Sequence, residues 1–209
     1  MVPLNREAPC AVIVMAKAPV AGLAKTRLIP ALRPDGAAAL AAWMLSQAVG
    51  QALAAALGPV MLCGAPDVTH PAFAALARDP GVTLHPQGEG DLGARMARAF
   101  ERALATHERA VLIGTDAPDL DAAVLRDAAA ALATHDAVFA PAHDGGYALV
   151  GLRRAQPRLF EAMPWSTAQV MAITRERLRD GGLRWHELPA LHDIDEPADL
   201  VHLGERAWR

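Results

Sequence analysis

The chain has 209 residues, of which 53% are hydrophobic and 21% are charged, and its formal net charge is −3 at pH 7. This length accommodates one large domain with a substantial core, and the hydrophobic content excludes a disordered chain. The small negative charge excludes a general attraction to nucleic acid or to anionic membranes, so any basic site must be local.

The two cysteines and the apolar segments indicate a reduced protein without a membrane anchor. Cys10 and Cys63 do not have the spacing of a metal-ligand pair. In the topology argued below they lie at opposite ends of neighbouring parallel strands, so we expect no disulfide and a cytoplasmic location. No segment approaches the length of a membrane span, and we expect none.

The first predicted strand and the loop after it are the most informative stretch. Residues 11–15 are an unbroken apolar run, typical of a strand buried on both faces of a parallel sheet. The loop that follows contains Lys17, Pro19, Gly22, Lys25 and Arg27. Open α/β sheets place ligands at this point, and three cations in so few residues favour a nucleotide phosphate. A solvated basic loop is the alternative.

Strands and helices alternate along the rest of the chain. We predict strands over residues 60–63, 82–84, 110–114, 137–140, 147–152 and 183–188. We predict a long helix after Pro34-Asp35-Gly36 that ends at Gly58-Pro59, with an apolar stripe over residues 41–53. Further helices are predicted from Thr69 and Pro71, over 92–106 and 121–133, from a Ser166-x-x-Gln169 capping box to 178, and near the C-terminus. Too few residues separate 137–140 from 147–152 for a crossover helix, so we expect an antiparallel pair. The predicted fold is α/β: one three-layer α/β/α domain, residues 1–209, with a mostly parallel mixed sheet.

Asp116 is the most specific candidate for a functional residue. It follows the apolar strand 110–114, at the sheet edge where the cationic loop lies, and Pro118 restricts Ala117 to extended backbone. A carboxylate facing a phosphate repels it unless a divalent cation lies between them, which predicts Mg²⁺ or Mn²⁺ at Asp116. The alternative is that Asp116 caps the next helix, a role we expect instead for Asp119.

Two further carboxylates are candidates. Asp195 is the natural second metal ligand, because Asp193 and Asp195 point the same way if the segment is extended. The alternative is a loop leading to a helix, with Asp199 in its first turn. Asp144 precedes two glycines and Tyr147. This stretch forms either a tight turn or a backbone segment that approaches a substrate closely, in which case Asp144 and Tyr147 offer hydrogen-bonding groups.

The remaining polar and aromatic candidates have structural alternatives. Asp91 caps its helix or joins Glu89 in binding a substrate hydroxyl, and we expect the cap. Trp165 stacks on a sugar or base, or packs half-buried. No catalytic role is assigned to the histidines at 85, 143, 186 and 192.

Six motifs occur in order between Cys10 and about Leu203: Lys-Ala-Pro-x-x-Gly-x-x-Lys-Thr-Arg-Leu, Gly-Asp-Leu-Gly-x-Arg-Met, Gly-Thr-Asp-x-Pro-x-Leu, Asp-Gly-Gly-Tyr, Pro-Trp-Ser-Thr and Asp-Ile-Asp-x-Pro-x-Asp-Leu. Together they resemble the DUF2064 family of glycosyltransferases, of the arsenosugar-biosynthesis and radical-SAM/selenodomain-associated type. That family lies in the GT-A nucleotide-diphospho-sugar transferase superfamily. The first two motifs also resemble those of the 2-phospholactate guanylyltransferases.

The resemblance implies a GT-A-like fold, a nucleotide against the first loop, a metal at Asp116 and a second contact from Asp195. We assign nucleotide binding to Ala16, Lys17, Ala18, Pro19, Gly22, Lys25, Arg27, Gln87, Gly93 and Thr115. Catalysis is assigned to Asp116, Asp144 and Lys25, and metal binding to Asp116 and Asp195 with Mg²⁺ or Mn²⁺. GT-A glycosyltransferases usually carry Asp-x-Asp, whereas here Thr115 precedes Asp116 and Ala117-Pro118 follow it.

Three functions fit these residues. The first is glycosyl transfer from a nucleotide-sugar to a small-molecule acceptor, with Asp144 as base. The second is nucleotidyl transfer, in which a phosphorylated acceptor attacks an NTP and releases pyrophosphate. The third is a non-catalytic nucleotide-binding module, which a salt bridge from Arg27 into the metal position would favour.

Overall fold

One mixed sheet of seven strands organises the described residues, which in this computed structural model are 10–204 and 208. The strands are β1 (Cys10–Lys17), β2 (Val60–Ala65), β3 (Val82–Pro86), β4 (Arg109–Ile113), β5 (Ala137–Pro141), β6 (Tyr147–Leu152) and β7 (Trp185–Glu187). Their order across the sheet is β3-β2-β1-β4-β6-β5-β7. Only β6 runs antiparallel to its neighbours β4 and β5, which confirms the expected mixed sheet.

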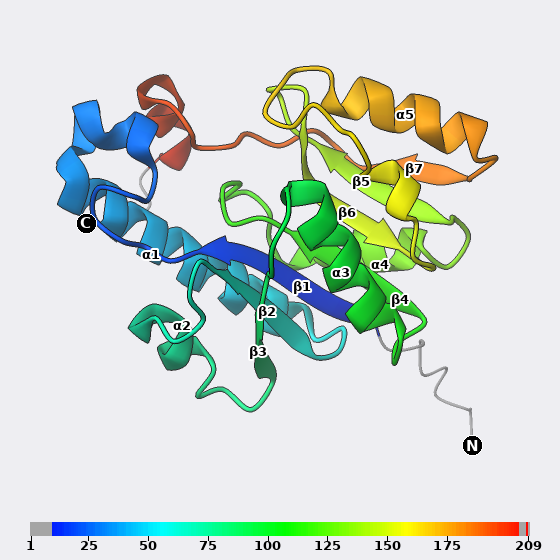
Figure 1. Ribbon diagram of the computed structural model, residues 1–209, viewed down its shortest axis with the longest axis horizontal. Coiled ribbons are helices and arrows are strands. Elements are labelled where there is room, and N and C mark those ends of the chain that lie inside the picture. Colours follow the sequence, from blue (N-terminus) through cyan, green and yellow to red (C-terminus); the bar gives the residue numbers. More distant parts are fainter. Residues whose placement is uncertain (1–9, 205–207, 209) are drawn as a thin grey trace.

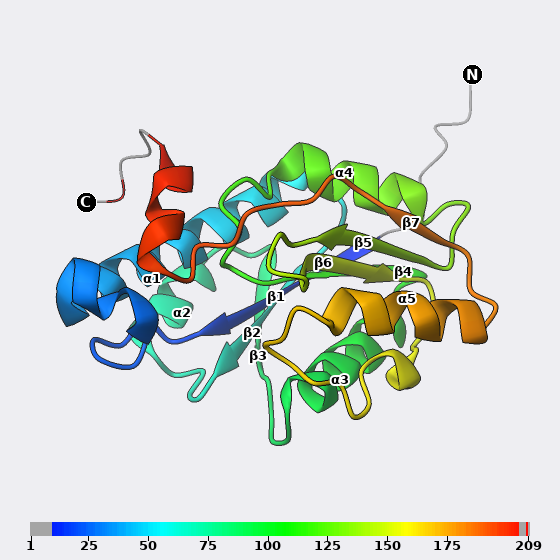
Figure 2. The same cartoon turned by 90° about the horizontal axis from the view of Figure 1, so that it is seen from above.

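Helices cover both faces of the sheet (Figures 1 and 2). One face carries α1 (Ile29–Ala55), α2 (Pro71–Leu76) and α4 (Ala122–Ala131), and the other carries α3 (Leu92–Leu104) and α5 (Val170–Asp180). Three 3₁₀ helices complete the fold: η1 (Thr26–Leu28), η2 (Pro157–Leu159) and η3 (Pro197–Leu203). The predicted three-layer α/β/α architecture is therefore confirmed.

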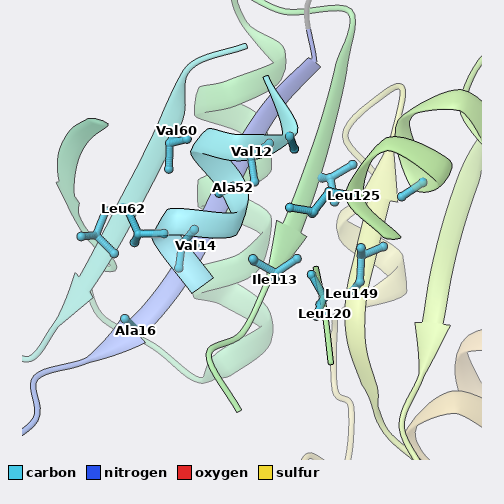
Figure 3. Close-up of a cluster of buried hydrophobic side chains, with 14 of the residues drawn as sticks. Val12, Val14, Ala16, Ala52, Val60, Leu62, Ile113, Leu120, Leu125 and Leu149 are labelled. Atoms are coloured by element: carbon cyan, nitrogen blue, oxygen red, sulfur yellow. The ribbon is translucent and has the colours of Figure 1, made fainter. Parts of the chain in front are cut away.

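Three clusters of buried side chains hold these layers together. The first joins β1, β2, β4 and β6 to α1 and α4, with Val14, Ala52 and Leu125 among its members (Figure 3). The second joins the opposite face of the sheet to α3 and α5. A third, smaller cluster joins Leu28 and the first half of α1 to Ile194 and η3, which lie side by side in both views. This third cluster brings the cationic loop and the C-terminal segment together.

The starts of several helices differ from the sequence expectations. α1 begins at Ile29, before the expected start after Gly36, and is kinked at Arg33, where the backbone turns left-handed (φ 62°) just before Pro34. The N-cap of α2 is His70 instead of Thr69, and α5 begins at Val170, without a side-chain cap from Ser166. α4 is capped by Asp121, not by Asp119.

Two expectations about the whole chain have different outcomes. Both cysteines are free and buried, as expected. The expectation that no segment approaches membrane-spanning length is wrong, because the helical segment Thr26–Ala55 has 30 residues and contains an 18-residue window with a mean hydropathy of 1.3. However, Leu45, Val49 and Ala52 of this helix pack into the first core cluster, which accounts for its apolar face.

Candidate functional site

The candidate site lies where the strand order reverses, between β1 and β4. From β1 the chain proceeds to β2 and β3 on one side, and then crosses to β4 on the other. Open α/β sheets bind ligands outside the carboxyl ends of the strands at such a switch point. The cationic loop leaves β1 there, Asp116 follows β4, and the segment before η3 crosses the same edge, since the Ile194 N–H donates to the Asp116 carbonyl at 2.9 Å.

Lys25 is the centre of this site. Its Nζ lies 2.5 Å from Asp116 Oδ1 and 3.0 Å from Asp195 Oδ1, and it donates to the Ile194 carbonyl oxygen at 2.6 Å. The Lys25 side chain is 9% exposed, whereas those of Asp116 and Asp195 are 46% and 47% exposed. The ammonium is thus covered by protein while the carboxylates still reach solvent.

Local structure holds these three groups in place. Lys25 has left-handed backbone (φ 47°), which directs the chain from the loop into η1. On the opposite side, the Asp199 carboxylate accepts from the backbone N–H groups of Asp195 and Glu196 at 3.0 and 2.7 Å. This is a capping box at the start of η3, and it fixes the backbone of Asp195. The expected place of Asp199 in the first turn is confirmed.

The electrostatics of the site are dominated by carboxylates. Burial by itself lowers the pKa of Lys25, but the adjacent Asp116 and Asp195 outweigh it and raise the pKa above its ordinary value. Burial, and then repulsion from Asp116, Asp144 and Asp195, raises the pKa of Asp193 to about 7. Four carboxylates therefore share one neighbourhood with a single buried ammonium, and this charge imbalance favours binding of a further cation.

We predict that Asp193→Asn stabilises the protein at high pH in a chelating buffer. The folded-state pKa of Asp193 exceeds the unfolded value of 3.8, so folding stability falls as the pH rises between them and stays low above about pH 7. At about 1.4 kcal/mol per pKa unit, the variant should gain roughly 1–3 kcal/mol more at pH 8 than at pH 5. Thermal unfolding at both pH values measures this, with Asp127→Asn on α4 as control. An equal gain at both pH values would contradict it.

The oxygen atoms around Lys25 Nζ fit a divalent cation. Two carboxylate oxygens and one carbonyl oxygen converge on the one point where the ammonium lies. Hard divalent cations such as Mg²⁺ and Mn²⁺ prefer such oxygen ligands. Within residues 10–204, no group of three His, Cys, Asp or Glu side chains is arranged to hold a metal, so this set has two side-chain ligands at most.

The other residues predicted to bind the nucleotide surround the same edge. Lys17 is exposed at the end of β1, and Gly22 has positive φ (80°) in the loop after it. Arg27 pairs with Glu196 at 3.9 Å, so it does not form the salt bridge into the metal position that would favour a non-catalytic module. Thr115 precedes Asp116, and its hydroxyl lies 3.5 Å from the Asp116 carboxylate.

Gln87 has a structural role next to this loop. It is buried, and its side-chain amide donates to the carbonyls of Ala16 and Cys63, at 2.9 Å in each case. It therefore joins the carboxyl ends of β1 and β2 beneath the cationic loop, whose Ala18 N–H donates to the Ala65 carbonyl at 2.7 Å. Direct contact of Gln87 with a nucleotide stays a prediction.

Gly93 lies in the first turn of α3, where packing explains the glycine. A Cβ atom at this position would lie 2.3 Å from the carbonyl oxygen of Phe160. We expect Gly93→Ala to lower the stability by about 1–3 kcal/mol through overpacking. Gly50→Ala is the control, because it adds its Cβ to open space on α1 and should stabilise by about 0.5–1 kcal/mol. An unchanged melting temperature for Gly93→Ala would contradict the packing explanation.

Asp144 and Tyr147 lie on one turn but in different environments. Asp144 is exposed, and its Oδ1 accepts from the Gly146 N–H at 2.8 Å in a tight turn. The Tyr147 hydroxyl and the Trp165 indole N–H are buried without a hydrogen-bond partner among the described residues. Their rings meet edge to face, with centroids 6.4 Å apart. Trp165 thus packs against protein, which is the second of the two alternatives for this residue. Burial raises the pKa of Tyr147.

His143 and His192, to which no catalytic role is assigned from the sequence, form a stack with a third histidine, His202. His192 lies between His143 and His202, with ring centroids 4.0 and 3.8 Å away. The stack joins the Asp144 turn to η3. No spacing in the sequence indicates it, because its members come from three separate segments. Asp91, by contrast, caps α3 as expected, accepting from the Ala94 N–H at 2.8 Å.

Known structures share this fold. A crystal structure from Desulfovibrio desulfuricans, provisionally named a nucleotide-diphospho-sugar transferase, is 30% identical, with a TM-score of 0.85 over 96% of this chain and 90% of that chain. CMP:2-keto-3-deoxy-manno-octonic acid synthetase in complex with CTP is 10% identical, with a TM-score of 0.58 over 94% and 97%. Rv0371C from Mycobacterium tuberculosis, in complex with manganese, is 20% identical, with a TM-score of 0.52 over 96% and 100%.

Family membership follows from the sequence comparison. No curated protein matches the chain. Residues 45–167, more than half of the sequence, match the family described as "Uncharacterized protein conserved in bacteria (DUF2064)". The Desulfovibrio structure extends the similarity over nearly the whole chain. The chain belongs to the DUF2064 family and has the fold of the nucleotide-diphospho-sugar transferases.

Proposed function

We propose that this protein is a metal-dependent transferase that uses a nucleotide-activated donor, and that it moves a sugar from a nucleotide-sugar to a hydroxyl group of a small acceptor. The observation that carries this proposal is the convergence of Lys25, Asp116 and Asp195 on one point at the switch between β1 and β4. A diphosphate leaving group needs cationic donors beside oxygen ligands for its counter-ion, and these residues offer both. The name of the Desulfovibrio relative, a nucleotide-diphospho-sugar transferase, supports a donor of this class, and the CTP complex of the synthetase supports a nucleotide-dependent transferase in general.

Each residue has a distinct role in this proposal. Lys17, Lys25 and Arg27 bind the diphosphate and stabilise the charge that develops as the bond to the sugar breaks. Asp116 and Asp195 would hold Mg²⁺ or Mn²⁺, and the bound cation would supply Lewis-acid stabilisation of a diphosphate. Asp144 accepts the proton of the acceptor hydroxyl through Oδ2, because its Oδ1 is engaged by the Gly146 N–H.

Nucleotidyl transfer is the second candidate, because the cationic loop also suits a triphosphate. Lys17 is exposed and has no ion pair within the described part of the chain, so it is available to a γ-phosphate. The four neighbouring carboxylates weigh against this reaction. A phosphorylated nucleophile would approach them as an anion and be repelled, whereas an uncharged hydroxyl would not.

Product analysis separates the two reactions. The protein is incubated with a panel of nucleotide-sugars, and separately with NTPs, in the presence of Mn²⁺ and of candidate acceptors. Release of a nucleoside diphosphate from a nucleotide-sugar is the expected result. Release of pyrophosphate from an NTP would reject glycosyl transfer in favour of nucleotidyl transfer, and neither product under any condition would favour a binding module.

A further inference from the structure

We propose that the ammonium of Lys25 and the divalent cation are alternative occupants of one position between Asp116 and Asp195. The site then takes the cation together with a diphosphate group, which receives the displaced ammonium. This inference rests on the proposed function, and it adds that Lys25 controls whether the cation alone can bind.

The contacts of Lys25 carry the first step. Its Nζ lies 2.5 Å from Asp116 Oδ1, 3.0 Å from Asp195 Oδ1 and 2.6 Å from the Ile194 carbonyl oxygen. These are the oxygens that a divalent cation would use, and the ammonium already contacts all three of them. A second positive charge at the same oxygens would repel the ammonium at contact distance, so the two cannot share the position.

The second step concerns the free-energy cost of moving the Lys25 ammonium away from its oxygen partners. The Lys25 side chain is 9% exposed and has three oxygen partners, so moving it aside breaks three charge-assisted contacts. A free cation must meet this cost alone. A diphosphate beside the loop offers the ammonium new anionic partners and so offsets it. Cation and diphosphate therefore assist each other, and the coupling is reciprocal by thermodynamic necessity.

Removal of the ammonium should therefore strengthen binding of the cation alone. We expect Lys25→Met to bind Mn²⁺ at least tenfold more tightly than the wild type without nucleotide, measured from the electron paramagnetic resonance signal of free Mn²⁺. Lys25→Arg keeps the charge and should bind Mn²⁺ as weakly as the wild type. Lys17→Met removes the other lysine of the sequence, and its affinity for Mn²⁺ alone should stay within threefold of the wild type.

Inorganic pyrophosphate tests the coupling. The baseline is the binding expected from two quantities: the affinity of the protein for each ligand alone, and the stability of the Mn²⁺–pyrophosphate complex in solution. Wild-type protein should bind the two ligands together more tightly than this baseline. In Lys25→Met this excess should disappear. If the wild type binds Mn²⁺ and Lys25→Met binds it no more tightly, this inference is wrong while the metal-dependent transferase stands. If neither protein binds Mn²⁺, alone or with pyrophosphate, the proposed metal site fails as well.

A measurement on the wild type keeps the inference testable if Lys25→Met does not fold. Lys17 and Lys25 are the only lysines, so acetylation by an amine-reactive reagent can be followed at each by mass spectrometry. Saturating Mn²⁺ should increase acetylation of Lys25 as the ammonium leaves its buried position, with exposed Lys17 as the internal reference. Addition of pyrophosphate should reduce it again. Binding of Mn²⁺ without any increase would overturn the inference.

Discussion

Replacement of Asp116 by asparagine is expected to weaken cation-dependent nucleotide binding by about 100-fold or more, since loss of even an indirect support of a metal ligand costs 10–100-fold. Asparagine keeps the size of the side chain but removes one of two carboxylates that face Lys25. The remaining pair of Lys25 and Asp195 is then electrically neutral, and a divalent cation gains little by entering it. The expected loss thus falls on the cation-dependent part of the affinity.

The cation-dependent part of the affinity is measured by titration calorimetry, in which a nucleoside diphosphate is added to the protein once with Mn²⁺ present and once with a chelator present. In the chelator, Asp116→Asn should bind the nucleotide at least as well as the wild type, because a carboxylate that repels phosphate is gone. Asp127→Asn, on the exposed face of α4, is the matched control and should retain the full effect of Mn²⁺. Undiminished enhancement by Mn²⁺ in Asp116→Asn would remove this residue from the metal site.

The fold could be predicted from the sequence because its core strands are short apolar runs with turn residues between them. Residues 11–15 and 110–114, for example, fall almost entirely within β1 and β4. The short β7, by contrast, covers only Trp185–Glu187 of the six residues expected. An edge strand depends on a single partner, here β5, and its length is set by that pairing and not by its own composition.

Helix starts were less predictable, because hydroxyl side chains have several possible partners. The Thr69 hydroxyl donates to Asp67 at 2.7 Å, which leaves His70 to cap α2 by accepting from the Ala72 N–H. Ser166 has left-handed backbone (φ 62°), which is not the extended conformation of a capping residue. Tertiary context selects among these local alternatives, and a motif such as Ser-x-x-Gln does not contain that information.

The candidate site could be predicted in its parts but not in its arrangement. The sequence indicates a cationic loop after one strand and Asp116 after another, because carboxyl ends of parallel strands meet at one edge. That Lys25 and not Arg27 reaches Asp116 depends on the left-handed turn at Lys25. The contact with Asp195 spans 170 residues of sequence and depends on the third core cluster. No local pattern encodes such a contact.

If Asp144 is the base of the proposed sugar transfer, its replacement by asparagine is expected to lower the rate by about 10²–10⁴-fold, the usual contribution of a general base. Asparagine retains an oxygen that can accept from the Gly146 N–H, so the turn is preserved while the proton acceptor is lost. Because Asp144 does not contact Lys25, nucleotide affinity should stay close to that of the wild type. The effect should therefore appear in kcat and not in the KM for the donor.

A comparison of two substitutions distinguishes a base from a residue that only shapes the turn, because Asp144→Asn keeps the hydrogen bond of the turn and loses only the proton acceptor. Asp144→Ala, which removes the accepting oxygen as well, should add a loss of stability to the loss of rate. A rate for Asp144→Asn within tenfold of the wild type would exclude Asp144 as the base. The proton of the acceptor would then have to pass to another of the neighbouring carboxylates.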